Sequence, residues 1–191
     1  MQWVAMFNGT FGALQYNGVE ALILALGARK VGPFAVEESV WLAPQRAAAG
    51  GDPVKSVRAK VRLYKALASA ESVLEVLVSE PKSHMMAVER AHMLGDSSTL
   101  LHNLGFEKHF DFVRRGQRYE MASEYTIELF RLKCNETKTE PERDYETRDG
   151  GNFWIMRVRR QLASEQRLAQ DGLAEVADLT KKLSGLVAFE E

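Results

Sequence analysis

Between residues 106 and 119 the chain reads FEKHFDFVRRGQRY, and this stretch indicates how the strands are arranged. Its phenylalanines alternate with polar residues, as in a strand that buries one face. The segment from Arg114 to Gln117 contains a glycine and predicts the tip of a hairpin. The return strand is predicted to run through Tyr119 into residues 125–133. We therefore expect neighbouring strands to run antiparallel.

Further strands are predicted where branched and aromatic residues cluster between turn residues. They cover residues 2–7, 36–42, 57–64, 72–79, 85–93 and 152–162. Helices are predicted from their caps. The first begins at Asn17 and ends at Gly27, the second lies between Asp96 and Gly105, and the third covers residues 172–184 after a cap at Asp171.

This order of elements predicts the fold class. Short strands occur in succession, and the regular strand-helix alternation of a parallel sheet is missing from the pattern. We expect an α+β protein that is mainly antiparallel β. The sheet should form an open or closed β-barrel with two to three short flanking helices.

Length and charge limit the function classes. The 191 residues fit one domain, residues 1–191, with an acidic loop at residues 135–151. Lys+Arg 25 against Asp+Glu 26 gives a net charge of -1, so overall charge does not favour nucleic acid or an acidic membrane. A single cysteine, Cys134, excludes an internal disulfide. The apolar run at 19–26 is too short for a membrane span and the start does not resemble a secretion signal, so we expect a soluble intracellular domain.

The sequence carries few signs of catalysis. It has no glycine-rich phosphate loop and no Gly-x-Ser-x-Gly turn, and its four histidines lack paired metal-ligand spacing. We therefore predict no catalytic residue, no metal ligand and no cofactor. One enzymatic alternative stays open, a metal-dependent tunnel-type triphosphatase, whose barrel strands carry Glu-x-Glu pairs pointing inward to hold a divalent cation.

The carboxylates that this alternative needs are poorly placed. The Glu-x-Glu of the chain is Glu140-Pro141-Glu142, in a loop with a central proline. Glu71 and Glu75 are four apart, as are Glu124 and Glu128, and each pair could share a strand face. Residues 57–63 alternate, and we expect the apolar set to point inward and the basic set outward. A catalytic tunnel needs the reverse pattern.

Two strands are apolar on both faces. In one, Phe153 and Ile155 alternate with Trp154, Met156 and Val158, and the first strand is similar. The second face must be covered by the chain's own terminal helices or by a partner protein. The candidate partner-binding residues are Trp3, Met6, Trp154, Met156 and Val158.

Basic residues form a second candidate surface. They lie in the strand at residues 57–64 and at the predicted hairpin tip, and they could be solvated faces or contacts for an acidic partner. These possible contacts are Arg58, Lys60, Arg62, Arg114, Arg115 and Arg118.

Three blocks of the sequence resemble one family, Mediator complex subunit 18. The first is the strand and glycine turn from Trp3 to Gly9, followed by the leucine-rich helix from Val19 to Gly27. The second comprises residues 100–106, 110–119 and 127–132, with a helix that ends in Leu-Gly-Phe, a glycine-containing hairpin and a long return strand. The third is the strand from Gly151 to Val158 with residues 176–190. The likeness spans most of the chain and is weakest between residues 44 and 93.

The resemblance implies a non-enzymatic role. Members of this family form an open antiparallel barrel that resembles the triphosphate-tunnel barrel in shape but lacks its catalytic carboxylates. They act as a structural subunit of the Mediator head module, in a heterodimer with the related subunit 20 and tethered by a helix of subunit 8. The implied setting is the nucleus, with other head-module subunits and RNA polymerase II as partners in transcription, and without direct nucleic-acid or membrane binding.

Overall fold

The computed structural model describes residues 2–42, 60–66, 71–79, 85–122, 124–134, 153–162 and 166–189. These form, in chain order, β1 (Gln2–Gly12), the 3-10 turn η1 (Ala13–Gln15), α1 (Tyr16–Ala25), β2 (Arg29–Leu42), β3 (Lys60–Ala66), β4 (Glu71–Ser79), β5 (Met85–Leu94), α2 (Ser97–Asn103), β6 (Glu107–Met121), β7 (Tyr125–Cys134), β8 (Phe153–Leu162), α3 (Gln166–Leu183) and β9 (Ala188–Phe189). The acidic segment at 135–151, Arg58 and His84 lie outside the described residues.

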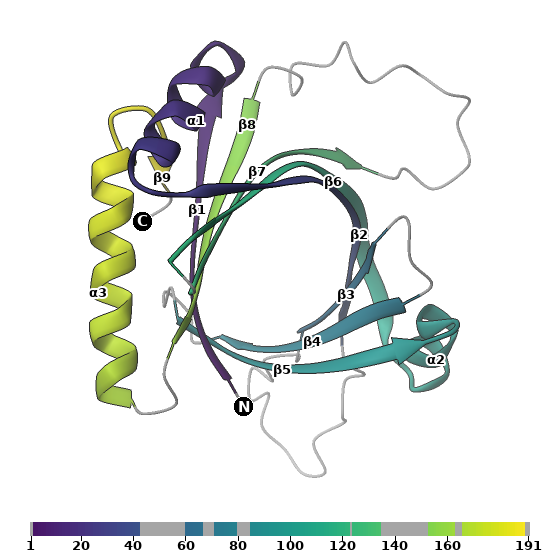
Figure 1. Cartoon of the computed structure of the whole chain (residues 1–191). Coiled ribbons are helices and arrows are strands. Elements are labelled where there is room, and N and C mark those ends of the chain that lie inside the picture. The colour runs from purple at the N-terminus through teal and green to yellow at the C-terminus, as the bar shows by residue number, and fades with distance from the viewer. Residues whose placement is uncertain are drawn as a thin grey trace, which may run out of the picture.

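The described strands form one antiparallel sheet in the order β5-β4-β3-β2-β6-β7-β8-β1-β9. Residues 2–5 of β1 also pair with residues 85–88 of β5, which joins the two sides of the sheet into a barrel. Further along β1, Gly9 and Thr10 pair with β9 and not with β5. Figure 1 shows the resulting ring, with α1 and α3 on one side and α2 on the other. The predicted fold class, mainly antiparallel β with three helices around a barrel, is confirmed.

The apolar core lies outside the ring, between the sheet and the helices. Met156 and Val158 of β8 are fully buried there with Ile23 of α1 and Val176 and Leu183 of α3. Because side chains alternate along a strand, the residues between them face the barrel interior. The chain's own helices therefore cover the second apolar face, which was one of the two explanations considered for the two-faced strands.

The predicted hairpin tip at Arg114 to Gln117 is wrong. Strand β6 continues through Gly116 to Met121, and the turn follows at Ala122, whose φ is 43°. Gly116 lies between β2 and β7, where an added Cβ would be 1.9 Å from the carbonyl oxygen of Leu129. A glycine within a strand can mark such a close backbone approach as well as a turn.

Several predicted boundaries also need correction. β1 runs on through Asn8 and Gly9, because both remain paired with β8. β2 begins seven residues earlier than predicted, at Arg29. α3 begins at Gln166, so the predicted helix at 172–184 is longer and Asp171 is not its cap.

Other local predictions are confirmed. The Thr99 amide donates to the Asp96 carboxylate at 3.1 Å, which caps α2. Gly27 and Gly105 follow their helices with φ of 95° and 82°, as expected of glycines that end a helix.

The predicted cap of the first helix is wrong. α1 begins at Tyr16, which places Asn17 in its first turn and not at the cap. Among the described helices, none has the length and apolar character needed to cross a bilayer.

Candidate functional site

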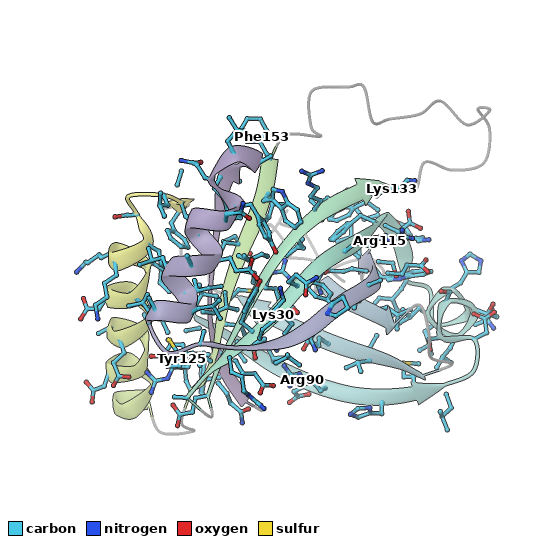
Figure 2. The ribbon with its side chains drawn as sticks, turned by 45° about the horizontal axis from the view of Figure 1, so that its top comes forward. Lys30, Arg90, Arg115, Tyr125, Lys133 and Phe153 are labelled. Carbon is cyan, nitrogen blue, oxygen red and sulfur yellow. The ribbon has the colours of Figure 1, made fainter. Side chains whose placement is uncertain are left out.

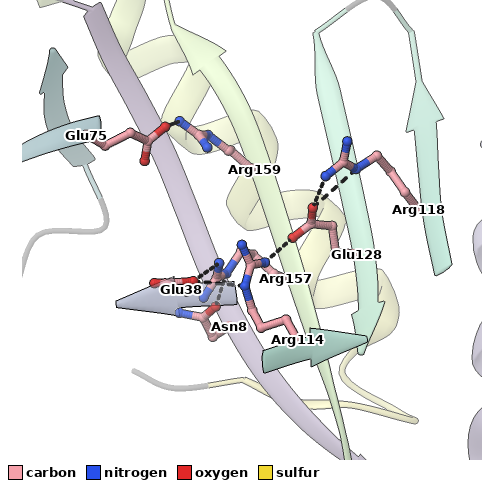
Figure 3. Close-up of polar contacts among 8 residues, drawn as sticks. All are labelled: Asn8, Glu38, Glu75, Arg114, Arg118, Glu128, Arg157 and Arg159. Atoms are coloured by element: carbon pink, nitrogen blue, oxygen red, sulfur yellow. Dashed lines mark hydrogen bonds and ion pairs between the residues drawn. The ribbon is translucent and has the colours of Figure 1, made fainter. Parts of the chain in front are cut away.

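Charged side chains occupy the barrel interior. In β8, Arg157 and Arg159 alternate with the outward-facing Met156 and Val158. Other strands place polar groups on the same inner face. Figure 3 shows the set, which consists of Asn8, Glu38, Glu75, Arg114, Arg118, Glu128, Arg157 and Arg159.

Arg114 is the centre of this network. Its Nε lies 2.8 Å from Oε2 of Glu38 on β2, and its Nη1 lies 2.6 Å from Oε2 of Glu128 on β7. The exposed fractions of the three side chains are 5%, 1% and 9%, so the ion pairs are shielded from water. Arg118 adds a second cation to Glu128, with 2.8 Å between Nη2 and Oε1. The Arg114 guanidinium also lies 5.2 Å from the centre of the Phe130 ring, within the range of a cation–π contact.

Two further ion pairs span the interior. Arg159 of β8 donates from Nη2 to Oε1 of Glu75 on β4 at 2.9 Å. Nη1 of Arg157 on β8 lies 3.8 Å from Oε2 of Glu38 on β2. Nε of the same arginine donates to Oδ1 of Asn8 at 3.0 Å. β8 neighbours neither β4 nor β2 in the sheet, so the two ion pairs join strands that are not neighbours, whereas Asn8 lies on the adjacent strand β1.

The arginines lower the pKa of two interior glutamates. Burial by itself would raise the pKa of Glu128, but the charges of Arg114, Arg118 and Arg157 outweigh it and the net shift is downward. Burial would likewise raise the pKa of Glu75, and the charges and hydrogen bonds of Arg159 and Arg90 lower it. Both carboxylates are therefore ionised at neutral pH and held by guanidinium groups.

This pairing restricts what the interior can do. A divalent cation needs several oxygen ligands that converge on one point. Here each of three interior glutamates has a carboxylate oxygen within 2.9 Å of an arginine nitrogen. They are Glu38, Glu75 and Glu128. Among the described residues, no group of three or more His, Cys, Asp or Glu side chains could hold a metal ion. In the described network, each of the three glutamates is thus held by at least one arginine.

The expected orientation of the strand at residues 57–64, with its apolar set pointing inward, is wrong at Leu63. Leu63 of β3 does not point inward, because it is buried against Trp41 and against Leu101 of the outlying helix α2. The backbone register places Arg62 opposite Glu75. The side chains of Lys60 and Arg62 are outside what the structure describes. The described inner face carries charged residues from several strands beside apolar ones such as Phe130, whereas the pattern at residues 57–63 predicted an apolar interior.

Of the two predicted carboxylate pairs, the structure tests Glu124 and Glu128, which are separated. Glu128 points into the barrel, whereas Glu124 binds Arg160, with 2.8 Å between Oε2 and Nη2, beside the outer helix α3. Arg160 also donates to the Gly172 carbonyl oxygen of α3 at 3.2 Å. The structure describes the Glu75 side chain but not that of Glu71.

The candidate partner residues occupy different environments. Met156 and Val158 are core residues with no exposed area, so the assignment of these two to a binding surface loses its basis. Trp3, Met6 and Trp154 are half-buried. The Trp154 ring lies 4.5 Å from that of Tyr16 and 4.7 Å from the Arg131 guanidinium, measured from the ring centre.

The candidate basic contacts divide as well. Arg114 and Arg118 belong to the interior network, and Arg115, between them in the chain, is exposed on the outer face. Sequence reasoning missed Asn8, Glu38, Arg157 and Arg159. The alternation of Arg157 and Arg159 with Met156 and Val158 was the available signal, because such a strand has one polar and one apolar face.

No protein-family model and no curated protein sequence matches the chain. Its structure is similar to solved structures. A chain in the Schizosaccharomyces pombe Mediator head module has a TM-score of 0.68 at 15% identity, covering 99% of this chain and 98% of that one. A Pyrococcus horikoshii protein has a TM-score of 0.62 at 16% identity, covering 97% and 93%. A candidate adenylate cyclase of Vibrio parahaemolyticus has a TM-score of 0.61 at 11% identity, covering 97% and 92%. At these identities the likeness establishes the barrel fold alone.

Proposed function

We propose that this chain is a non-enzymatic structural subunit of a Mediator head module, of the subunit 18 type. In this role it pairs with the related subunit 20, is tethered by a helix of subunit 8 and supports transcription by RNA polymerase II in the nucleus. The sequence blocks described above and the similarity to a chain of the S. pombe head module support this assignment.

The observation that carries the non-enzymatic part is the pairing of the interior carboxylates. Glu38 and Glu128 share Arg114, and Glu75 is held by Arg90 and Arg159. Freeing a carboxylate for a cation would leave an arginine without its counter-charge in a shielded environment, which is costly. The pairs therefore oppose metal binding by these glutamates.

Purification of the tagged chain from nuclear extract of its own organism tests the assembly role. We expect the head-module subunits, including subunits 8 and 20, to be recovered in stoichiometric amounts. Recovery of the chain alone, or with an unrelated set of proteins, would overturn the proposal. Trp154→Asp tests whether Trp154 lies at the interface, and Leu94→Asp is the control, because Leu94 is exposed at the end of β5, next to α2 on the other side of the ring.

The second candidate is a metal-dependent tunnel-type triphosphatase. One observation favours it: the described interior holds four arginines, Arg114, Arg118, Arg157 and Arg159, which could bind phosphoryl oxygens. Incubation of the purified chain with inorganic triphosphate and Mn²⁺ tests it. We expect no turnover above that of a Glu128→Gln variant, whereas turnover abolished by this substitution would establish the enzyme.

A further inference from the structure

Two arginines face each other on the outer surface of the sheet. In the register of β6 and β7, Arg115 pairs directly with Arg131. Both side chains are exposed. They lie on the outer face because Arg114 and Phe130, their neighbours in the chain, meet in the interior. Like charges in directly opposed positions of an antiparallel pair are destabilising.

Lys133 extends this basic surface. It lies two residues beyond Arg131 on the same face of β7, and the register places it opposite Val113, diagonal to Arg115. It is exposed, and Figure 2 shows Arg115 and Lys133 close together near the end of β7. We call Arg115, Arg131 and Lys133 the outer basic cluster.

The outer basic cluster differs from the other arginines of the barrel. Those of the interior each face a glutamate, and Arg160 outside is held by Glu124. Among the described residues, no carboxylate lies within ion-pair distance of Arg115, Arg131 or Lys133. The described contact of Arg131 is with the face of Trp154, which itself lies against Tyr16. Of the three cations, Arg131 thus borders an aromatic pair.

We infer that the outer basic cluster is a docking site for an acidic segment of a protein partner. Carboxylates would supply the counter-charges that the described residues do not give the cluster, and an arginine can bind a carboxylate through two parallel hydrogen bonds. The Tyr16–Trp154 pair beside it offers a half-buried aromatic surface for an apolar residue of the same segment. Rim charges of this kind mainly raise the rate of association and make binding salt-dependent.

A labelled oligoglutamate peptide tests the inference on the purified chain, with oligoglutamine and single-stranded oligothymidylate as comparison probes. We expect saturable binding of oligoglutamate that weakens as salt increases. The double variant Arg115→Glu/Arg131→Glu should reduce the affinity about tenfold or more, since two exposed ion pairs of about 0.7 kcal/mol each correspond to that factor. The control, Lys181→Glu/Lys182→Glu, makes the same charge change on exposed positions of α3 and should leave the affinity unchanged.

Three results would overturn the inference: no saturable binding of oligoglutamate, equal losses in the double variant and the control, or binding of oligothymidylate in place of oligoglutamate. Thermal unfolding of both variants shows whether a loss of affinity for oligoglutamate is caused by misfolding. If a variant is misfolded, the affinity of Lys133→Glu is measured in its place. The assay uses this chain alone, so its outcome is separate from the recovery of head-module subunits.

Discussion

Arg159 of β8 and Glu75 of β4 form an ion pair across the barrel interior, with 2.9 Å between Nη2 and Oε1. Their strands are separated in the sheet by β1 and β5, so the pair joins parts of the barrel that backbone hydrogen bonds do not join directly. Arg90, the register neighbour of Glu75 on β5, supplies a second cation to the same oxygen at 2.7 Å.

Glu75→Gln should destabilise the protein, because it leaves Arg159 and Arg90 without their counter-charge. Both arginines retain some solvent exposure, so we expect a loss of about 2 kcal/mol, below the 3–5 kcal/mol typical of breaking a fully buried pair. Urea unfolding measures the change. Glu124→Gln is the control, because Arg160 keeps Glu175 as a partner, and an equal loss there would contradict the special role of Glu75.

Stability should decrease in acid. Glu75 and Glu128 have a lower pKa in the folded protein than in the unfolded chain, so the unfolded state binds more protons as the pH falls. Their contribution is complete above the pKa of an unfolded glutamate, about 4.3, and is lost as the pH falls through the lower folded values. Urea midpoints measured from neutral pH to pH 3 test this. A Glu75→Gln/Glu128→Gln variant with the same acid dependence would refute the assignment.

Gly116→Ala should unfold the barrel or destabilise it by about 3 kcal/mol or more, as expected when backbone must move to admit a side chain. An added Cβ would lie 1.9 Å from the Leu129 carbonyl oxygen and 2.7 Å from the Cα of Phe130, and neither can move without disturbing the ladder to β7. Gly185→Ala is the matched control, since nothing lies within 4 Å of its added Cβ. Thermal unfolding of both variants, compared with the wild type, gives the answer.

Arg115→Glu should raise the stability of the isolated chain while it weakens the binding of oligoglutamate. The substitution turns a like-charge pair with Arg131 into an opposite-charge pair, worth about 0.5 kcal/mol for a cross-strand contact. The gain should shrink at high salt. A lower urea midpoint than that of the wild type would mean that Arg115 stabilises the fold. Lys182→Glu, in the last turn of α3, is expected to give no gain.

Strand and helix positions were largely predictable because they depend on local pattern. The caps at Asp96, Gly27 and Gly105 follow from short-range hydrogen bonding and backbone freedom, and the structure confirms them. The prediction failed at Gly116, since a glycine that permits a turn and one that permits a close strand neighbour look the same in sequence. Only the neighbouring strands β2 and β7 distinguish the two.

The pairing of the interior charges was not predictable from one strand at a time. Glu75 and Arg159 are 84 residues apart, and Glu38 and Arg157 lie on strands that do not pair with each other. Neither pair leaves a periodic signal in the sequence. The partner assignment of Met156 and Val158 failed for a related reason, because the helices that bury them lie far away in the chain.

Alternating strands and separate capped helices follow from the amino-acid sequence alone, because alternation and capping depend on residues a few positions apart. Which face of each strand points inward depends on packing between elements that are distant in the chain. Alternation is the same whichever face is turned to the interior. The choice is made when α1 and α3 bury one face of β1 and β8, which leaves the arginines and glutamates to pair within the barrel.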